Sequence, residues 1–145
     1  MEWVEALSGA KVALDAAPLI YFAEEHPHYL PLIEPFFVAL DQGRFQALAS
    51  TVALLEVLIH PIRENNLQLA QTYREILQQS GVIATIPVSA AIAETAANLR
   101  AHSKIKTPDA LHVATALHTG AGFFITNDRR LPTVQGLKII ALADL

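Results

Sequence analysis

Short apolar runs alternate with longer helical segments along the whole chain. Five runs have the length and composition of buried strands, at residues 11–14, 45–49, 82–86, 123–125 and 137–140. Six segments between them favour helix, at residues 16–22, 32–40, 52–59, 67–79, 88–102 and from Thr107 to the turn at Gly120, with His60 and Pro61 expected to interrupt the third. Strands that alternate with helices predict an α/β protein whose central parallel sheet of about five strands is covered on both faces.

The segment from Thr107 to Arg130 has the most specific pattern. Thr107 is expected to cap a helix, Pro108 suits its first turn, and Asp109 places a carboxylate at the positive end of the helix dipole. After the helix, Gly120 begins a turn that leads into a short strand, and a polar segment that includes Asp128 follows that strand. One segment therefore supplies two acids, one at a helix start and one at a strand end.

Composition narrows the class of protein. With 145 residues we expect a single domain, residues 1–145, and the hydrophobic fraction of 52% suits helices and strands that are buried on several sides. Cysteine is absent, which excludes disulfides and thiolate metal sites. The first residues lack the pattern of a secretory signal, and no apolar run reaches the roughly 18 residues of a membrane span. The expected location is therefore cytoplasmic, without a membrane partner.

Four acids lie where the predicted elements could bring them together. Asp15 follows the first strand and Asp128 follows the fourth, while Glu56 and Asp109 lie on helices. Parallel sheets bind ligands beyond the carboxyl ends of their strands, at the point where strand order reverses. If the first and fourth strands are neighbours there, each pair of carboxylates at about 5 Å repels by roughly 3 kcal/mol at an effective dielectric constant of 20. Oxygen ligands without cysteine favour Mg²⁺ or Mn²⁺ as the neutralising ion.

Each acid also has a structural interpretation. Asp15 could be a helix cap, Asp109 a helix-start charge and Asp128 a turn residue. Glu56 has fewer such explanations, because it is the only charge in the apolar segment 52–59. The six histidines show no metal-binding spacing with each other and are interpreted as surface or packing residues.

Basic residues gather around two of the acids although the net charge is −4. Half of all lysines and arginines flank Asp109 and Asp128: Arg100, Lys104, Lys106, Arg129 and Arg130. They are either solvated surface charges or a rim that contacts phosphates.

Three motifs resemble the PIN-domain ribonucleases, including toxins of the VapC type. They are LDAAPLIYF near the start, STVALLEVLIHP in the first half and TPDALHVATALHTGAGFFITNDRRL near the end. The resemblance covers nearly the whole chain and implies a three-layer α/β/α sandwich that hydrolyses RNA with Mg²⁺ or Mn²⁺. It assigns Asp15, Glu56, Asp109 and Asp128 as the catalytic, metal-binding acids. It further implies a supporting hydrogen bond from Thr126, a role for Asn127 in holding the turn, a cognate antitoxin of a type II toxin–antitoxin system, and a homodimer.

One feature departs from the family pattern. Many members have Ser, Thr or Asn within two residues of the first acid, whereas Ala16 and Ala17 follow Asp15 here. A hydrogen bond to this acid is therefore either missing or supplied from elsewhere, with Ser50 and Thr126 as candidates. A weakly catalytic or non-catalytic RNA-binding scaffold stays open as the alternative. An aspartyl-phosphate enzyme of the haloacid-dehalogenase kind is disfavoured, because it needs a second acid at the position of Ala17.

Overall fold

Five parallel strands form the centre of the molecule in the computed structural model, which describes residues 1–145. The strands are β1 (Lys11–Leu14), β2 (Gln46–Ser50), β3 (Ile83–Ile86), β4 (Phe123–Thr126) and β5 (Lys138–Ala141). Their order is β3-β2-β1-β4-β5, so the strand order reverses between β1 and β4. These two strands pair directly, with Leu14 opposite Ile125. The predicted sheet and the predicted neighbours at its reversal point are both confirmed.

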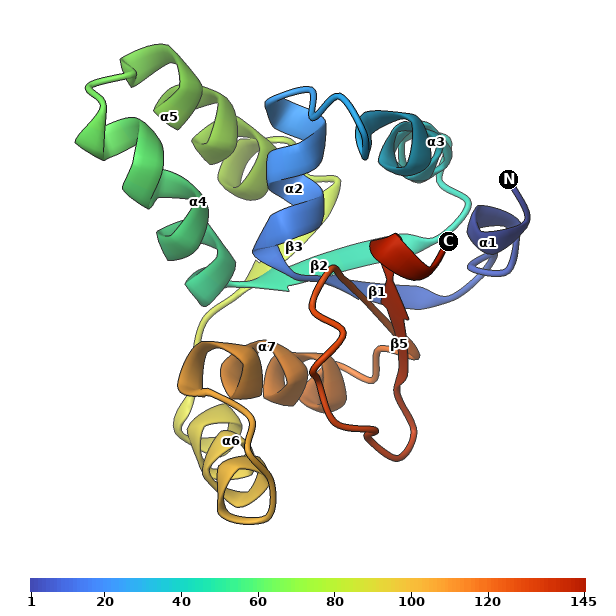
Figure 1. Ribbon diagram of the computed structural model, residues 1–145, viewed down its shortest axis with the longest axis vertical. Helices are drawn as coiled ribbons and strands as arrows, with labels where there is room; N and C mark the ends of the chain where they lie inside the picture. The colour runs from blue at the N-terminus through green and yellow to red at the C-terminus, as the bar shows by residue number, and fades with distance from the viewer.

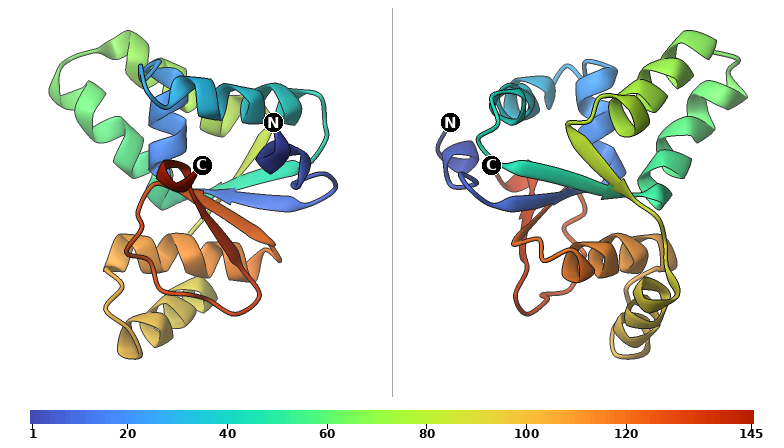
Figure 2. Two further views of the ribbon diagram at one scale, coloured as in Figure 1. Left: turned by 45° about the vertical axis from the view of Figure 1, so that its right-hand side comes forward. Right: turned by 180° about the vertical axis from the view of Figure 1, so that it is seen from behind.

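Helices cover the two faces of the sheet in separate layers (Figures 1 and 2). One layer contains α2 (Ala16–Ala23), α3 (Leu30–Asp41), α4 (Thr51–Arg63) and α5 (Leu67–Arg74), with the short α1 (Glu2–Glu5) at its edge. The other layer contains α6 (Ala90–Ala101) and α7 (Thr107–His118). A π-helical turn, η1 (Glu75–Gln79), follows α5, and a 3₁₀ turn, η2 (Leu142–Asp144), follows β5. This is the three-layer α/β/α sandwich that the sequence implied.

The strands separate two hydrophobic cores. Successive strand residues point to opposite faces. Val12 and Leu14 therefore join the larger core under α2 to α5, and Ala13 joins the smaller core under α6 and α7. Small residues dominate the smaller core, and Ala110 and Ala114 of α7 are fully buried. The resulting close packing holds the start of α7 beside the carboxyl ends of the strands (Figure 2).

Most helix ends differ from the prediction by one or two residues, and two expected local signals do not act as predicted. Helix α4 passes through Pro61 and ends at Arg63, although a proline cannot donate the helical hydrogen bond to the residue four positions earlier. Pro61 lies in the last turn and is buried, so its packing outweighs one missing bond. The start of α7 is capped differently from the expectation, because Lys106 holds the N-cap position without a side-chain bond. Thr107 instead accepts a hydrogen bond from Arg100, at 2.8 Å.

No helix in the structure combines the length and the apolar character that crossing a bilayer requires.

Candidate functional site

The first acid is fixed by the strand that precedes it and the helix that follows. The backbone of Asp15 extends the pairing of β1 with β4 by donating to the carbonyl of Ile125, at 3.0 Å. One carboxylate oxygen caps α2 by accepting from the N–H of Ala16, at 2.7 Å. The other accepts from the hydroxyl of Thr126, also at 2.7 Å. Both oxygens are thus oriented, and only 13% of the side chain is exposed.

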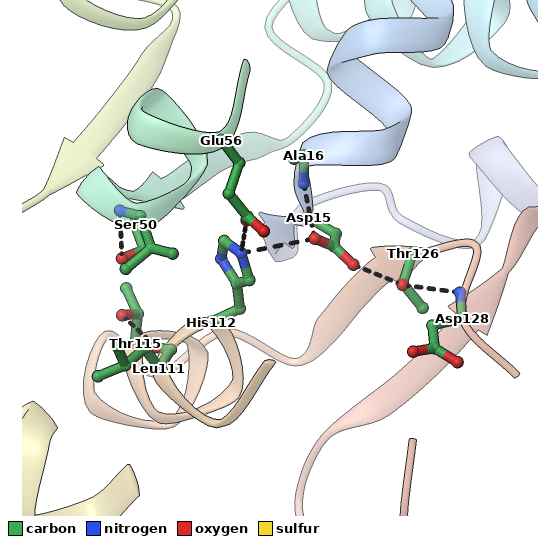
Figure 3. Close-up of polar contacts among 10 residues, drawn as sticks. Asp15, Ala16, Ser50, Glu56, Leu111, His112, Thr115, Thr126 and Asp128 are labelled. Atoms are coloured by element: carbon green, nitrogen blue, oxygen red, sulfur yellow. Dashed lines mark hydrogen bonds and ion pairs between the residues drawn. The ribbon is translucent and has the colours of Figure 1, made fainter. Parts of the chain in front are cut away.

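Thr126 supplies the hydrogen bond that Ala16 and Ala17 cannot. This threonine is fully buried at the end of β4, and its hydroxyl also accepts from the N–H of Asp128, at 3.1 Å. Thr126 therefore connects Asp15 with the loop that carries Asp128 (Figure 3). Ser50, the other candidate, is used elsewhere, because its hydroxyl caps α4 by accepting from Val52.

Glu56 is held by a residue that the sequence analysis did not assign to the site. Oε1 of Glu56 lies 2.5 Å from Nε2 of His112, and Oδ1 of Asp15 lies 3.5 Å from the same nitrogen. Figure 3 shows the imidazole ring between these two carboxylates. His112 is buried on α7, one turn after Asp109, whereas the Glu56 side chain is 32% exposed. The interpretation of all six histidines as surface or packing residues is therefore wrong for His112.

A sequence signal for His112 does exist. It is the only titratable side chain between Asp109 and His118 of α7, among small and apolar residues, as Glu56 is within residues 52–59. The same argument that singled out Glu56 applies to it, since an isolated polar group on a buried face needs a partner.

The four predicted acids line one cleft at the carboxyl ends of β1 and β4. This cleft, of about 610 Å³, is bordered by Asp15 at the N-cap of α2, by Glu56 and Asp109 on α4 and α7, and by Asp128 from the loop after β4. We call it the acid cleft. Asp15 and Glu56 of the cleft form a tight group with the buried His112 behind them, and the ligand-type atoms of the three residues lie within 4.8 Å of one another. We call Asp15 and Glu56, which contact the buried His112, the inner half of the cleft, and Asp109 and Asp128, which also line a second cavity, its outer half.

Burial, hydrogen bonds and neighbouring charges shift several pKa values at the cleft. Burial raises the pKa of Asp109 above its ordinary value, and the nearby carboxylates of Asp15 and Asp128 raise it further. Burial would lower the pKa of His112, but the hydrogen bond to Glu56 and the charge of Asp15 outweigh this effect and raise it. The pKa of Asp128 is lowered, because the side chain and the backbone N–H of Arg130 donate to its carboxylate.

The donor set of this cleft fits a hard divalent cation. Carboxylate oxygens suit Mg²⁺ and Mn²⁺, and a cation would relieve the repulsion that raises the pKa of Asp109. Nε2 of His112 points at Glu56 and Asp15, so this ring is suited to orienting carboxylates. Its other nitrogen, Nδ1, is buried without a partner.

Asn127 ties the loop after β4 to two other parts of the molecule. Its amide nitrogen donates to the hydroxyl of Tyr21 on α2, at 2.9 Å. Its amide oxygen accepts from the N–H of Ala143 in η2, at 2.8 Å. Asn127 thus holds the turn that precedes Asp128.

Solved structures with the same fold include toxin–antitoxin proteins. VapBC2 from Rickettsia felis, bound to a DNA fragment from its promoter, superposes with a TM-score of 0.70 at 16% identity and covers 90% of this chain and 98% of that one. A toxin–antitoxin complex from Klebsiella pneumoniae has a TM-score of 0.66 at 24% identity and covers 87% and 94%. VapC20 from Mycobacterium tuberculosis, a toxin that cleaves the sarcin-ricin loop, has a TM-score of 0.66 at 15% identity and covers 78% and 86%.

Sequence comparison identifies the family. No curated protein sequence matches this chain significantly. The family model described as the PIN domain matches residues 12–137, which include all four acids of the cleft. The chain therefore belongs to the PIN-domain family, and it has the fold of VapC-type toxins.

Proposed function

We propose that the protein is an endoribonuclease that depends on Mg²⁺ or Mn²⁺ and acts as the toxin of a type II toxin–antitoxin pair. The observation that carries this proposal is the convergence of four carboxylates in one cleft at the reversal point of the sheet. RNA as the substrate and an antitoxin as the partner are supported by membership of the PIN-domain family and by the fold shared with VapC20.

In this proposal Asp15, Glu56, Asp109 and Asp128 hold the cation. When bound, the cation supplies Lewis-acid stabilisation of phosphate charge and lowers the pKa of water. The chain's own residues orient the carboxylates beforehand. Thr126 and the N–H of Ala16 direct the two oxygens of Asp15, and His112 directs Glu56. Ligands that are oriented in this way lose less conformational freedom when a cation binds.

The alternative of a non-catalytic scaffold depended on a missing hydrogen bond beside Asp15. Thr126 donates such a bond, so that observation no longer favours the alternative. Titration calorimetry with Mn²⁺ distinguishes the two functions. We expect binding to the wild-type protein, weaker binding to Glu56→Gln, and unchanged binding to Glu34→Gln, which removes an exposed acid from α3. Absence of Mn²⁺ binding to the wild type favours the scaffold.

Hydrolysis itself is tested with purified protein and single-stranded RNA. We expect cleavage with Mg²⁺ or Mn²⁺, none in the presence of a chelator, and a rate at least about 100-fold lower in Asp15→Asn. Asp41→Asn is the matched control, because Asp41 is an exposed acid at the end of α3. Cleavage that persists in Asp15→Asn or with chelator rejects the assigned site.

If the protein is a toxin of this kind, we expect it to bind an antitoxin and to form a homodimer. If a small gene lies immediately upstream, co-expression should yield a stable complex whose formation suppresses cleavage. Size-exclusion chromatography with light scattering measures whether the isolated chain is a dimer.

A further inference from the structure

Lysines and arginines are distributed unevenly around the acid cleft. Between Lys11 and Arg44 the chain has neither residue type, so α2 and α3 offer no cation. The only one on α4 is Arg63, in its last turn. Five others belong to the connection between α6 and α7 and to the segment after β4: Arg100, Lys104, Lys106, Arg129 and Arg130. The cleft therefore has one cationic side.

Two of these five cations are engaged in the fold. Arg100 donates to the carbonyl of Ile105 and to the hydroxyl of Thr107, at 3.0 and 2.8 Å, which ties the α6–α7 connection together. Arg129 forms an ion pair with Asp144, at 2.8 Å, and also donates to the carbonyl of Ala143. Both guanidinium groups already donate hydrogen bonds within the fold.

The other three cations line one cavity of about 390 Å³, which we call the basic cavity. Lys104 and Lys106 form no ion pair, and Arg130 pairs with Asp128. The basic cavity also contains Asp109 and Asp128, which are lining residues of the acid cleft as well. The two cavities thus adjoin through these acids. The charge of Lys106 also contributes to the lowered pKa of Asp128, which is consistent with this proximity.

We propose that the basic cavity binds a backbone phosphate of the RNA strand that the acid cleft cleaves. This inference rests on the proposed function and adds the path by which the RNA strand leaves the cleft. Four carboxylates repel a polyanion that enters their cleft, unless nearby cations offset the negative charge. Only the side with Lys104, Lys106 and Arg130 provides them. The strand therefore leaves the cleft between the α6–α7 connection and the segment after β4, and not along α2 or α4.

Lys104 and Lys106 give the cleaner test, because Arg130 contacts one of the proposed metal-binding acids. Both lysines are exposed, so their substitution leaves the core intact. The probe is a single-stranded oligouridylate, and its binding is measured by fluorescence anisotropy in chelator over a series of salt concentrations. Each phosphate contact on a single strand contributes about 0.7 to the slope of log K against log salt concentration. Loss of both lysines should therefore reduce the magnitude of that slope by roughly 0.7, the contribution of the one phosphate in the basic cavity.

Three variants complete the experiment. Lys104→Gln/Lys106→Gln should show the smaller slope, and Lys104→Arg/Lys106→Arg should retain the wild-type slope, because the positive charge is kept. Arg63→Gln/Lys138→Gln is the control, since it removes two exposed cations that line neither cavity. An equal slope for wild type and the double Gln variant, an equal loss in the control, or absence of RNA binding by the wild type overturns the proposal.

The chelator separates this result from the hydrolysis test. If the wild type cleaves RNA but the slope is unchanged, the phosphate site is rejected and the nuclease proposal stands. If the slope falls as expected but no cation supports cleavage, the phosphate site stands and hydrolysis is rejected.

Discussion

The inner and outer halves of the acid cleft are built in different ways. In the inner half, Asp15 and Glu56 are oriented by Thr126 and His112, partners that lie 111 and 56 residues away in the chain. In the outer half, Asp128 is oriented by Arg130, only two residues away, and that arginine is 79% exposed at its side chain. The inner half therefore depends on the packing of the whole sandwich. The carboxylate of Asp128 depends on one surface turn, so the two halves should respond differently to substitution.

The largest difference is expected in RNA cleavage. Glu56→Gln should lower the cleavage rate by about 1000-fold, because loss of one charged ligand removes several kcal/mol of transition-state stabilisation. Asp128→Asn should cost only about tenfold, since Arg130 already neutralises part of that charge. Single-turnover cleavage rates at saturating Mn²⁺ measure both. Equal losses for the two variants contradict the division into halves.

The next effect concerns metal affinity and isolates the hydroxyl of Thr126. Thr126→Val keeps the size of the side chain but removes the hydroxyl that donates to Asp15. Mn²⁺ affinity should therefore fall by roughly 10- to 100-fold. Thr126→Ser should retain most of it. The matched control is Thr115→Val, because Thr115 is also buried but its hydroxyl donates to Leu111 within α7. Calorimetric titration compares the three variants, and equal affinities for both valine variants remove the proposed role of Thr126.

Local sequence signals located the five strands, the main helices and the four acids, and the family resemblance implied the hydrogen bond from Thr126, but His112 was missed. Asp15, Asp109 and Asp128 stand at strand or helix ends, and such ends are marked by neighbouring residues in the sequence. Glu56 was recognisable because it interrupts an apolar helix. The role of His112 depends instead on Glu56, on a different helix, so no local pattern defines it. Its isolation among alanine and valine residues marked it only as a polar group that needs some partner.

The helix ends also show that local sequence signals do not reveal contacts between distant parts of the chain. Pro61 is a local signal for a break, yet α4 continues through it with the proline buried. Thr107 has the chemistry of a cap, but Arg100 from the preceding helix occupies its hydroxyl. Of the two candidates for the hydrogen bond to Asp15, the sequence could not exclude Ser50. The choice of Thr126 follows from the pairing of β1 with β4.

A smaller effect is expected for stability when His112 is replaced. His112→Leu leaves Glu56 and Asp15 without a shared donor, so the free energy of unfolding in chelator should fall by about 2 kcal/mol. His112→Gln keeps an N–H donor and should lose about half as much. Urea denaturation followed by circular dichroism measures both. If leucine is tolerated as well as glutamine, the histidine acts through its volume and not through its hydrogen bond.

The smallest effect is the pH dependence of stability without metal. The raised pKa of His112 adds stability that is fully present below its unfolded value of 6.5 and is lost as pH rises through the higher folded value. The raised pKa of Asp109 acts in the same direction from its unfolded value of 3.8 upward. The melting temperature in chelator should therefore decline as pH rises from mildly acidic to mildly alkaline.

Two variants assign this decline to the two halves of the cleft. His112→Gln should flatten its upper part and Asp109→Asn its lower part, because each variant removes one titrating group. Saturating Mn²⁺ should raise the melting temperature more at the alkaline end, where the carboxylates that bind it are fully ionised. A melting temperature that rises with pH in chelator would mean that the cleft tolerates its charges without a cation. The electrostatic reason for placing a metal there would then be lost, whatever the cleavage assay shows.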